Sequence, residues 1–162
     1  MRTLSNYRVG NLKVRAAVTK PNENTLTMMP VRSLVYVPKK YPVEAGEILS
    51  FDGKDDDLLL ATHHENPEYW VFMGLHMNAT VTIEKRFSGI NPVTKMKQGS
   101  FTVEPITCRA VHELGKLIDD RGLQTSRDVY YVAEQVKEGD VIDGQSITGV
   151  QKLNGIYYIE VK

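Results

Sequence analysis

Short runs of apolar residues, many of them alternating with polar ones, follow one another along the chain and are separated by turn residues. Residues 12–18 alternate loosely, and residues 31–37 are rich in β-branched and aromatic side chains between two prolines. Both patterns are typical of β-strands. Asp52-Gly53 favours a hairpin, because a type I′ turn needs positive φ at its central residues. Several short strands with frequent turn signals predict a small barrel or sandwich.

The second half of the chain repeats the order of the first half. The matching segments, first copy and then second, are residues 15–18 and 109–111, 32–38 and 127–133, 43–49 and 136–142, Asp52-Gly53 and Asp143-Gly144, and 66–72 and 154–159. Two copies at this spacing indicate a duplicated small domain rather than a solenoid, which needs at least about three stacked units.

The repeat divides the chain into two β units and a connecting segment. We predict a mainly β protein with two tandem small β-barrel or sandwich units and at most one or two short helices. The first unit, with an N-terminal arm, covers residues 1–76, the second covers residues 101–162, and residues 77–100 connect them. A unit of roughly 60 residues buries only about 60% of its unfolded surface, so we expect the units to pack on each other or on a neighbouring chain.

The connecting segment combines a strand pattern with a basic loop. Residues 78–84 alternate like a strand, and residues 85–99 contain no acidic residue. A loop longer than about 12 residues in a compact domain is usually functional or disordered. We therefore predict that the loop contacts a partner or DNA phosphates, with a flexible solvated loop as the alternative. Its candidate contact residues are Lys85, Arg86, Lys95 and Lys97.

The second copy also contains a helical pattern that the first copy lacks. Val111, Leu114, Leu117 and Ile118 fall on one face of a helix, and Gly122 fits a helix C-terminal stop. We therefore predict a short helix there. The first copy has a proline and two asparagines at this place, which indicate a loop.

The composition is typical of a soluble globular protein, with 41% apolar and 25% charged residues. Twenty basic residues balance twenty acidic ones, so no global field favours nucleic acid or an acidic membrane. Cys108 is the only cysteine, which excludes an intrachain disulfide and favours a reducing compartment. We expect no signal peptide and no membrane span, since no apolar run approaches about 18 residues.

Several polar groups invite a chemical interpretation, but none has the spacing of a known site. His63-His64, with His76 further on, lacks a metal-binding spacing, so solvated turn histidines are the simpler interpretation. Asp55-Asp56-Asp57 lacks the rest of a calcium loop and fits a charged hairpin tip. Cys108 is expected to be a small core residue rather than a nucleophile near His112. We predict no catalytic, cofactor-binding or metal-binding residue.

Aromatic residues close each copy. Tyr69, Trp70, Tyr157 and Tyr158 are expected to pack in cores or interfaces, and stacking on nucleic-acid bases is the alternative. Tyr157, Tyr158 and Ile159 are also candidates for an edge strand that extends the sheet of a neighbouring chain; the alternative is that this strand is paired within its own barrel.

The second copy resembles a known family in the order of its segments. The strands at residues 101–105 and 106–111 lead to a helix-like segment at 113–117, a strand at 128–132, the turn at 136–144 and a closing hairpin to Val161. This order resembles the head-closure proteins, also called stopper, head-completion or head-tail connector proteins, in the neck of long-tailed bacteriophages.

The resemblance implies a structural virion protein without enzymatic activity or cofactor. Proteins of this family are small β-barrels that form a ring beneath the portal, retain packaged DNA and dock the tail. The implied partners are further copies of the chain in a homo-oligomeric ring, the portal or adaptor, and the tail terminator, with packaged double-stranded DNA contacted non-specifically. The implied location is the virion, assembled in the host cytoplasm.

The duplication suggests how such a ring would match its neighbours. Six chains with two barrels each would present twelve quasi-equivalent units. The alternative functions are a tandem SH3-like barrel protein that binds nucleic acid and another structural subunit of a phage tail or baseplate. Aromatic and basic residues on one exposed sheet face would favour nucleic acid. An enzyme has no supporting motif in the sequence.

Overall fold

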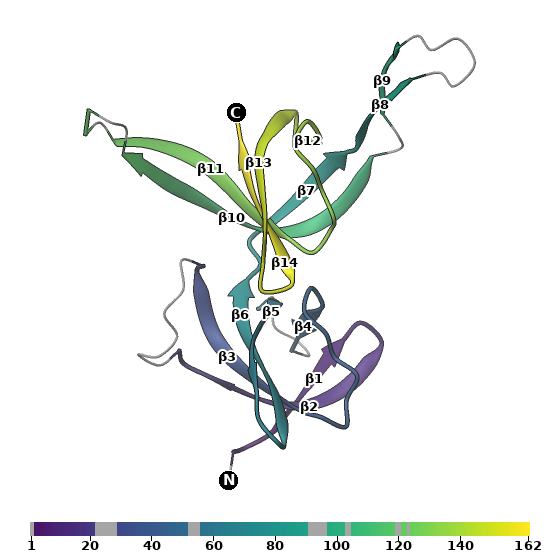
Figure 1. The fold of residues 1–162 in the computed structure, drawn as a ribbon. Helices are drawn as coiled ribbons and strands as arrows, with labels where there is room; N and C mark the ends of the chain where they lie inside the picture. The colour runs from purple at the N-terminus through teal and green to yellow at the C-terminus, as the bar shows by residue number, and fades with distance from the viewer. Residues whose placement is uncertain are drawn as a thin grey trace.

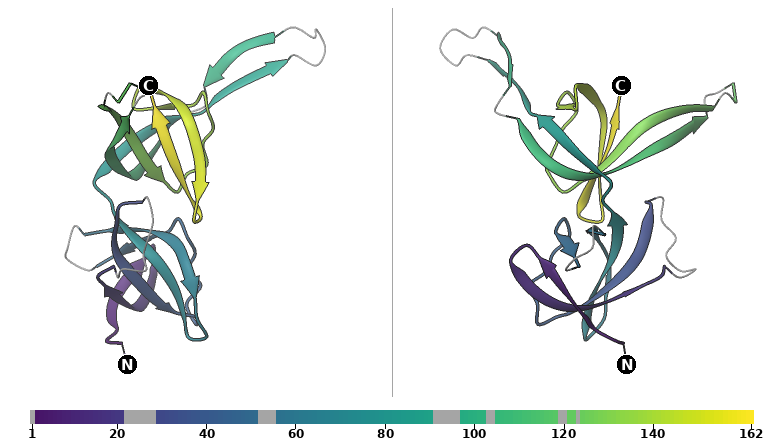
Figure 2. Two further views of the ribbon diagram at one scale, coloured as in Figure 1. Left: turned by 60° about the vertical axis from the view of Figure 1, so that its left-hand side comes forward. Right: turned by 180° about the vertical axis from the view of Figure 1, so that it is seen from behind.

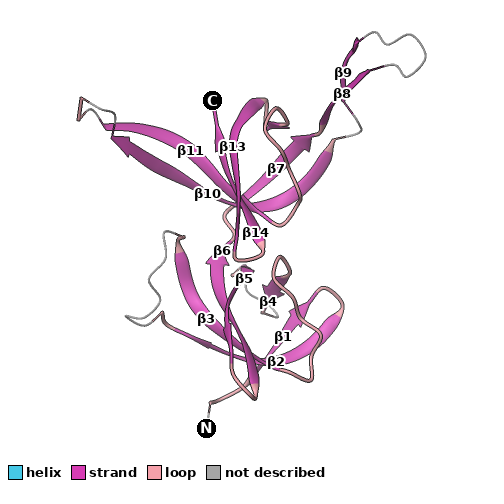
Figure 3. Cartoon of the chain, viewed as in Figure 1, coloured by secondary structure: helices cyan, strands magenta, loops and turns pink. Residues whose placement is uncertain are grey.

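The computed structural model describes residues 2–21, 29–51, 56–90, 97–102, 105–118, 121–122 and 124–162. Within these residues every regular element is a β-strand, and the strands form two closed six-stranded barrels (Figures 1 and 3). The predicted fold class is therefore confirmed.

The first barrel closes in the order β1-β2-β3-β6-β5-β4, with antiparallel pairing throughout. Its first three strands run in sequence around the barrel, and β6 and β5 then lead back to β4, which pairs with β1. The strands are β1 (Ser5–Val9), β2 (Leu12–Thr19), β3 (Val31–Pro38), β4 (Ile48–Ser50), β5 (Leu58–Glu65) and β6 (Tyr69–His76).

The second barrel closes in the order β10-β11-β14-β13-β12-β7. Counted from β7, this is the same cyclic order as in the first barrel, which is consistent with an internal duplication. The strand at residues 79–84, assigned above to the connecting segment, is β7 and belongs to this barrel. Its strands are β7 (Ala79–Glu84), β10 (Ile106–Ile118), β11 (Gln124–Val132), β12 (Val141–Ile142), β13 (Gln145–Leu153) and β14 (Ile156–Val161).

Alternating side chains fill each barrel, because successive residues of a strand point to opposite faces. In β3, Val35 and Val37 join an apolar cluster whose members come only from the first barrel. In β11, Tyr130 and Val132 belong to the equivalent cluster of the second barrel. These two clusters are the barrel interiors.

A turn of the same design precedes β4 and β12. Gly46 and Gly139 both have φ of 92°, a conformation that favours glycine. The Gly46 N–H donates to the Leu60 carbonyl, and the Gly139 N–H donates to the Ile147 carbonyl. Asp143-Gly144 forms the hairpin between β12 and β13 with positive φ at both residues, as predicted. Asp52-Gly53 lies outside the described residues.

The two barrels share a third apolar cluster, which holds them together. Leu34, Tyr36 and Met73 of the first barrel belong to it together with Val129 and Tyr131 of the second barrel. In β3, β5 and β6 both faces are therefore buried, one inside the barrel and one in this joint. In the amino-acid sequence, strands buried on both faces show continuous apolar runs rather than alternation of apolar and polar residues.

Hydrogen bonds and a close backbone approach fix the joint. The turn between β13 and β14 lies against the first barrel (Figures 1 and 2). The Thr62 N–H donates to the Asn154 carbonyl at 2.8 Å, and the Asn154 side-chain amide donates to the Thr62 carbonyl at 2.7 Å. The bulge between Thr62 and His64 interrupts the β5–β6 ladder at this point, where the backbone of Thr62 bonds to the other barrel.

The predicted helix after Val111 is wrong. Residues 106–118 form β10, which pairs first with β7 and then, from Val111 onward, with β11. The apolar spacing is not a buried helical face, since Leu114 is 67% exposed. Long-range strand pairing overrides the local periodicity here. Gly122 has a φ of 75° and belongs to the turn between β10 and β11 rather than to a helix end.

Candidate assembly interface

A two-stranded hairpin projects from the second barrel, and we call it the β8–β9 arm. It consists of β8 (Arg86–Ile90) and β9 (Lys97–Thr102), which pair with each other and with no third strand in the described chain. It extends away from both barrels in every view (Figures 1 and 2). The predicted basic loop is thus largely a hairpin, inserted where the first barrel joins β1 to β2 by only Gly10-Asn11.

The base of the arm is fixed to the barrel by a buried carboxylate. Asp140 is only 1% exposed, and its Oδ1 accepts a hydrogen bond from the Arg86 N–H at 2.9 Å. Its Oδ2 accepts one from the Lys137 N–H at 3.0 Å. Lys85 adds an ion pair to Glu134 at 2.5 Å. Both oxygens of the carboxylate are therefore satisfied, as a buried charge requires.

The four predicted basic contact residues lie in different settings. Lys85 is already paired with Glu134, and Arg86 is exposed at the base of the arm. Lys97 begins β9 opposite Ile90, and only its backbone is described. Lys95 lies outside the described residues. The arm therefore separates the described positions along its length instead of gathering them into one patch.

The predicted edge strand is not an edge. β14, which contains Tyr157, Tyr158 and Ile159, pairs with β11 on one side and β13 on the other. Its backbone groups are engaged in the closed barrel, so this strand has no free side for a neighbouring chain. Ile159 is fully buried in the barrel interior. Tyr158 points to the opposite face of the sheet.

That opposite face is hollowed into an open groove of about 370 Å³, which we call the tyrosine groove. The rings of Tyr131 and Tyr158 are 5.4 Å apart between centroids. The Tyr158 hydroxyl donates to Glu160 Oε1 at 3.1 Å, and Arg127 pairs with Glu160 Oε2 at 3.3 Å. The lining residues come from β10, β11, β13 and β14 and are Glu113, Gly115, Val129, Tyr131, Gln151, Leu153, Tyr158 and Glu160.

Two carboxylates line the tyrosine groove, those of Glu113 and Glu160, and Arg127 pairs with the second. Burial raises the pKa of Glu113, an effect that nearby His112 partly offsets. Burial, with Glu113 and Tyr158 as further causes, raises the pKa of Tyr131 to about 12. Among the described residues, the Glu113 carboxylate has no hydrogen bond or ion pair, in contrast to Glu160. Sequence reasoning missed this site because Glu113 was placed on a helix and its neighbours come from distant strands.

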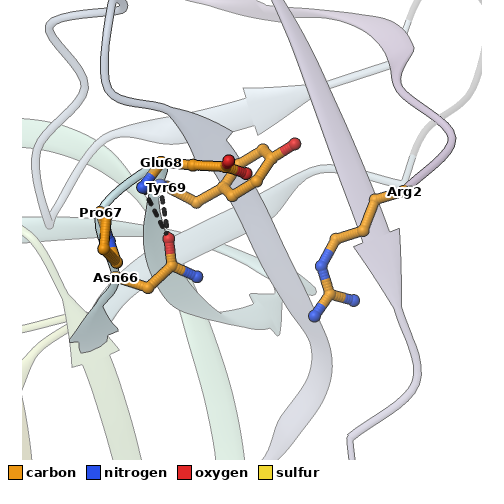
Figure 4. A pocket seen from close by; sticks show the side chains of 5 residues that line it. All are labelled: Arg2, Asn66, Pro67, Glu68 and Tyr69. Atoms are coloured by element: carbon orange, nitrogen blue, oxygen red, sulfur yellow. Dashed lines mark hydrogen bonds between the residues drawn. The ribbon is translucent and has the colours of Figure 1, made fainter.

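A second hollow, of about 870 Å³, lies at the outer end of the first barrel (Figure 4). The Asn66 Oδ1 accepts the N–H groups of Glu68 at 3.0 Å and Tyr69 at 2.7 Å, which closes the turn between β5 and β6. Arg2 lies across the hollow, and its guanidinium carbon is 3.6 Å from the centroid of the Tyr36 ring. The polar groups here hold the turn and the N-terminal segment in place.

The remaining candidate groups take structural positions. His63 and His64 lie on β5 rather than in a turn, with ring centroids 4.6 Å apart. Asp56 pairs with Arg32, and Asp57 pairs with Arg109 of the second barrel, so both carboxylates hold other segments; Asp55 lies outside the described residues. No group of three potential metal ligands occurs in the part of the chain that the structure describes.

Cys108 is half-buried beside the interior of the second barrel, as expected for a small packing residue. Burial raises the pKa of its thiol, which opposes thiolate formation. The described residues include no helix long and apolar enough to cross a membrane.

Comparison of the chain with protein-family models, with curated proteins and with solved structures finds no match. The functional argument therefore rests on the geometry of the barrels, the β8–β9 arm and the tyrosine groove.

Proposed function

We propose that this protein is a structural subunit that assembles with copies of itself through the β8–β9 arm. The observation that carries the proposal is a hairpin whose two edges pair with no other described strand and whose base is held by a buried carboxylate. A two-stranded hairpin is marginally stable by itself in water. Its unpaired edges offer backbone groups to another chain. An arm with a fixed base and free edges suits a contact between subunits.

The joint between the barrels supports the same proposal. The shared apolar cluster and the Thr62–Asn154 hydrogen bonds favour one fixed arrangement of the barrels. An arm on such a body projects in one direction. An arm that reaches a different surface of the next copy forms a head-to-tail contact, and contacts of this kind close into a ring or continue as a filament.

We further propose that the assembly is a ring in the neck of a long-tailed phage, where it retains packaged DNA and docks the tail. The helix-like segment of the resemblance to head-closure proteins is strand β10, so the support comes from the rest of the order: the strand at 128–132, the turn at 136–144 and the closing hairpin. The common strand order of the two barrels adds support, because six chains would then present twelve similar units. The portal or adaptor and the tail terminator would be its partners in the virion. A tail or baseplate subunit is the nearest alternative.

The nucleic-acid alternative has weaker support from the described surface. The open aromatic groove of the second barrel is lined by Glu113 and Glu160, which would repel phosphates. On the first barrel, Trp70 is partly exposed below Lys39, but Lys39 is also paired with Glu65. Any DNA contact in this proposal is non-specific and made by the assembled ring.

The proposal is tested by replacing the arm with the short connection found in the first barrel. Residues 86–104 are exchanged for a Gly-Asn turn like Gly10-Asn11. Mass photometry and sedimentation velocity should show oligomers of the natural chain and monomers of the variant. Circular dichroism checks that the variant keeps its barrels. Monomers of the natural chain at all concentrations, or unchanged oligomers of the variant, would contradict assembly through the arm.

The phage assignment has its own test. Antibodies against the protein, viewed by electron microscopy of virions, should label the junction between head and tail. Label at the tail tip would favour a baseplate subunit instead, and virions without the protein would remove the assignment.

A further inference from the structure

The turn between β13 and β14 carries the only asparagine-glycine pair of the sequence, Asn154-Gly155. Both residues have positive φ, 50° at Asn154 and 82° at Gly155, as a type I′ hairpin turn requires. The turn lies against the first barrel, yet both residues are exposed to solvent (Figure 2). A chemically reactive pair therefore stands at the joint, where water can reach it.

An asparagine before a glycine readily loses its side-chain amide, because glycine has no Cβ to hinder the approach of its main-chain nitrogen. The Gly155 nitrogen attacks Asn154 Cγ, and the new bond replaces the bond from Cγ to Nδ2. Nδ2 leaves as ammonia and takes up the proton of the Gly155 N–H. Water then opens the cyclic imide at one of its two carbonyls and leaves an aspartate or an isoaspartate. Water is the only co-reactant.

The joint opposes the first step of this reaction. The Asn154 side-chain amide donates to the Thr62 carbonyl at 2.7 Å, and the Asn154 carbonyl accepts the Thr62 N–H at 2.8 Å. The amide must leave Thr62 before its Cγ can reach the Gly155 nitrogen. Both hydrogen bonds cross from one barrel to the other, so they open when the joint opens locally. The reaction is then limited to the fraction of molecules with an open joint.

The products do not fit the joint that the asparagine forms. The bond to the Thr62 carbonyl needs an N–H donor, and an ionised carboxylate has only acceptors. An isoaspartate also adds one carbon to the main chain. Gly155 packs so closely on Ala45 that even an added Cβ would be too near it. Neither product therefore restores the contact between the barrels.

The equivalent turn of the first barrel differs in both respects. Asn66 precedes Pro67, whose nitrogen has no proton to lose. The Asn66 Oδ1 acts as an acceptor for the N–H groups of Glu68 and Tyr69, a role that a carboxylate oxygen also fills. Asn66 is therefore a matched internal control for Asn154.

We propose that Asn154 is a site of spontaneous deamidation that the joint protects, and that loss of its amide loosens the two barrels. The joint of an aged chain is then weaker than the joint of a newly made one. The β8–β9 arm takes no part in the reaction, so the site does not depend on the proposed assembly.

Rates of deamidation test the protection. The full chain and a synthetic peptide of residues 149–159 are incubated in the same mildly alkaline buffer, and mass spectrometry of their peptides follows Asn154 and Asn66. Asn154 should react in both samples, but about tenfold to a hundredfold more slowly in the folded chain, because two hydrogen bonds must open first. Asn66 should stay intact. Equal rates in chain and peptide would refute protection, and an unreactive peptide would remove the site.

Two valine variants on β11 separate the joint from the barrel itself. Val129 belongs to the shared cluster of the joint, and Val132 belongs to the interior of the second barrel. Val129→Ala should raise the rate of deamidation in the folded chain, and Val132→Ala, which removes the same atoms, should raise it less. Equal acceleration by both variants would assign the protection to the barrel and overturn the role of the joint.

Hydrogen exchange tests the consequence of the lost amide. Asn154→Asp should speed exchange of the Thr62 amide by about tenfold to a hundredfold, since the carboxylate cannot donate to the Thr62 carbonyl. Asn66→Asp makes the same chemical change and should leave exchange at Thr62 unaltered. If the Thr62 amide of Asn154→Asp exchanged as slowly as in the natural chain, deamidation would not loosen the joint.

Discussion

The closest approach in the joint gives a sharp prediction about how the barrels are held together. A Cβ atom placed on Gly155 would lie 2.5 Å from the Cβ of Ala45, well inside the ordinary contact distance of about 3.5–4.0 Å. Gly155 also has a φ of 82°, which disfavours any other residue. The substitution Gly155→Ala therefore carries two costs, one from the backbone and one from the joint.

The chain provides a control that isolates the second cost. Gly144 has a φ of 79°, and a Cβ there would have no neighbour within 4 Å. Gly144→Ala should lower the free energy of unfolding by about 1–2 kcal/mol, the cost of the left-handed backbone. Gly155→Ala should lower the free energy of unfolding by about 1–3 kcal/mol more, because the added methyl group overpacks the joint and forces the two barrels apart at Ala45. Weakened Thr62–Asn154 hydrogen bonds would add to this difference.

A double-mutant cycle assigns the difference to the contact with Ala45. The variant Ala45→Gly removes the atom that Gly155→Ala would meet, so the pair should show a coupling of about 1–3 kcal/mol. The assay is urea unfolding followed by the fluorescence of Trp70, the sole tryptophan, and by circular dichroism of both barrels. In Gly155→Ala the two signals should separate, since a weakened joint uncouples the barrels. Equal effects of the two glycine variants and zero coupling would refute this account of the joint.

Two further predictions concern the second barrel. Asp140→Asn should speed hydrogen exchange at the amides of Arg86 and Lys137 and destabilise the protein by about 1–3 kcal/mol, because both amides donate to the buried Asp140 carboxylate. Glu47→Gln, in the equivalent turn, should cost less, because within the described residues the Glu47 carboxylate accepts one backbone amide, that of Glu44. The raised pKa of Tyr131 implies stability that is present below pH 10 and lost as the pH rises through about 12, so Tyr131→Phe should flatten that loss in alkaline unfolding curves.

The order of the elements was predictable from the sequence because turns are local. The glycines at 46 and 139 adopt the same φ, and Asp143-Gly144 reverses the chain where expected. These residues form a turn through their own backbone conformation, without help from distant strands. The matching order of the turns therefore predicted two units of one topology, and both barrels have the same cyclic strand order.

Features that depend on distant strands were not predictable in this way. The helical spacing after Val111 is real in the sequence, but β7 and β11 pair with that segment and make it β10. The sequence around Tyr158 fits an edge strand as well as a central strand, and only the closed barrel shows that β14 is paired on both sides. Glu113 acquires its place in the groove from that same pairing. A local pattern cannot indicate which strand lies alongside.

The joint between the barrels cannot be repeated to build a longer stack. At the joint, Gly155 of the β13–β14 turn approaches Ala45, which lies beside Gly46. The equivalent residue beside Gly139 in the second barrel is Glu138, and the equivalent β5–β6 turn of the first barrel contains Pro67 and Glu68. A second copy docked in the same manner would bring larger residues and two carboxylates together where the joint has a glycine and an alanine. The joint therefore does not suit a longer stack of barrels, which agrees with the proposed assembly through the β8–β9 arm, an element that the first barrel lacks.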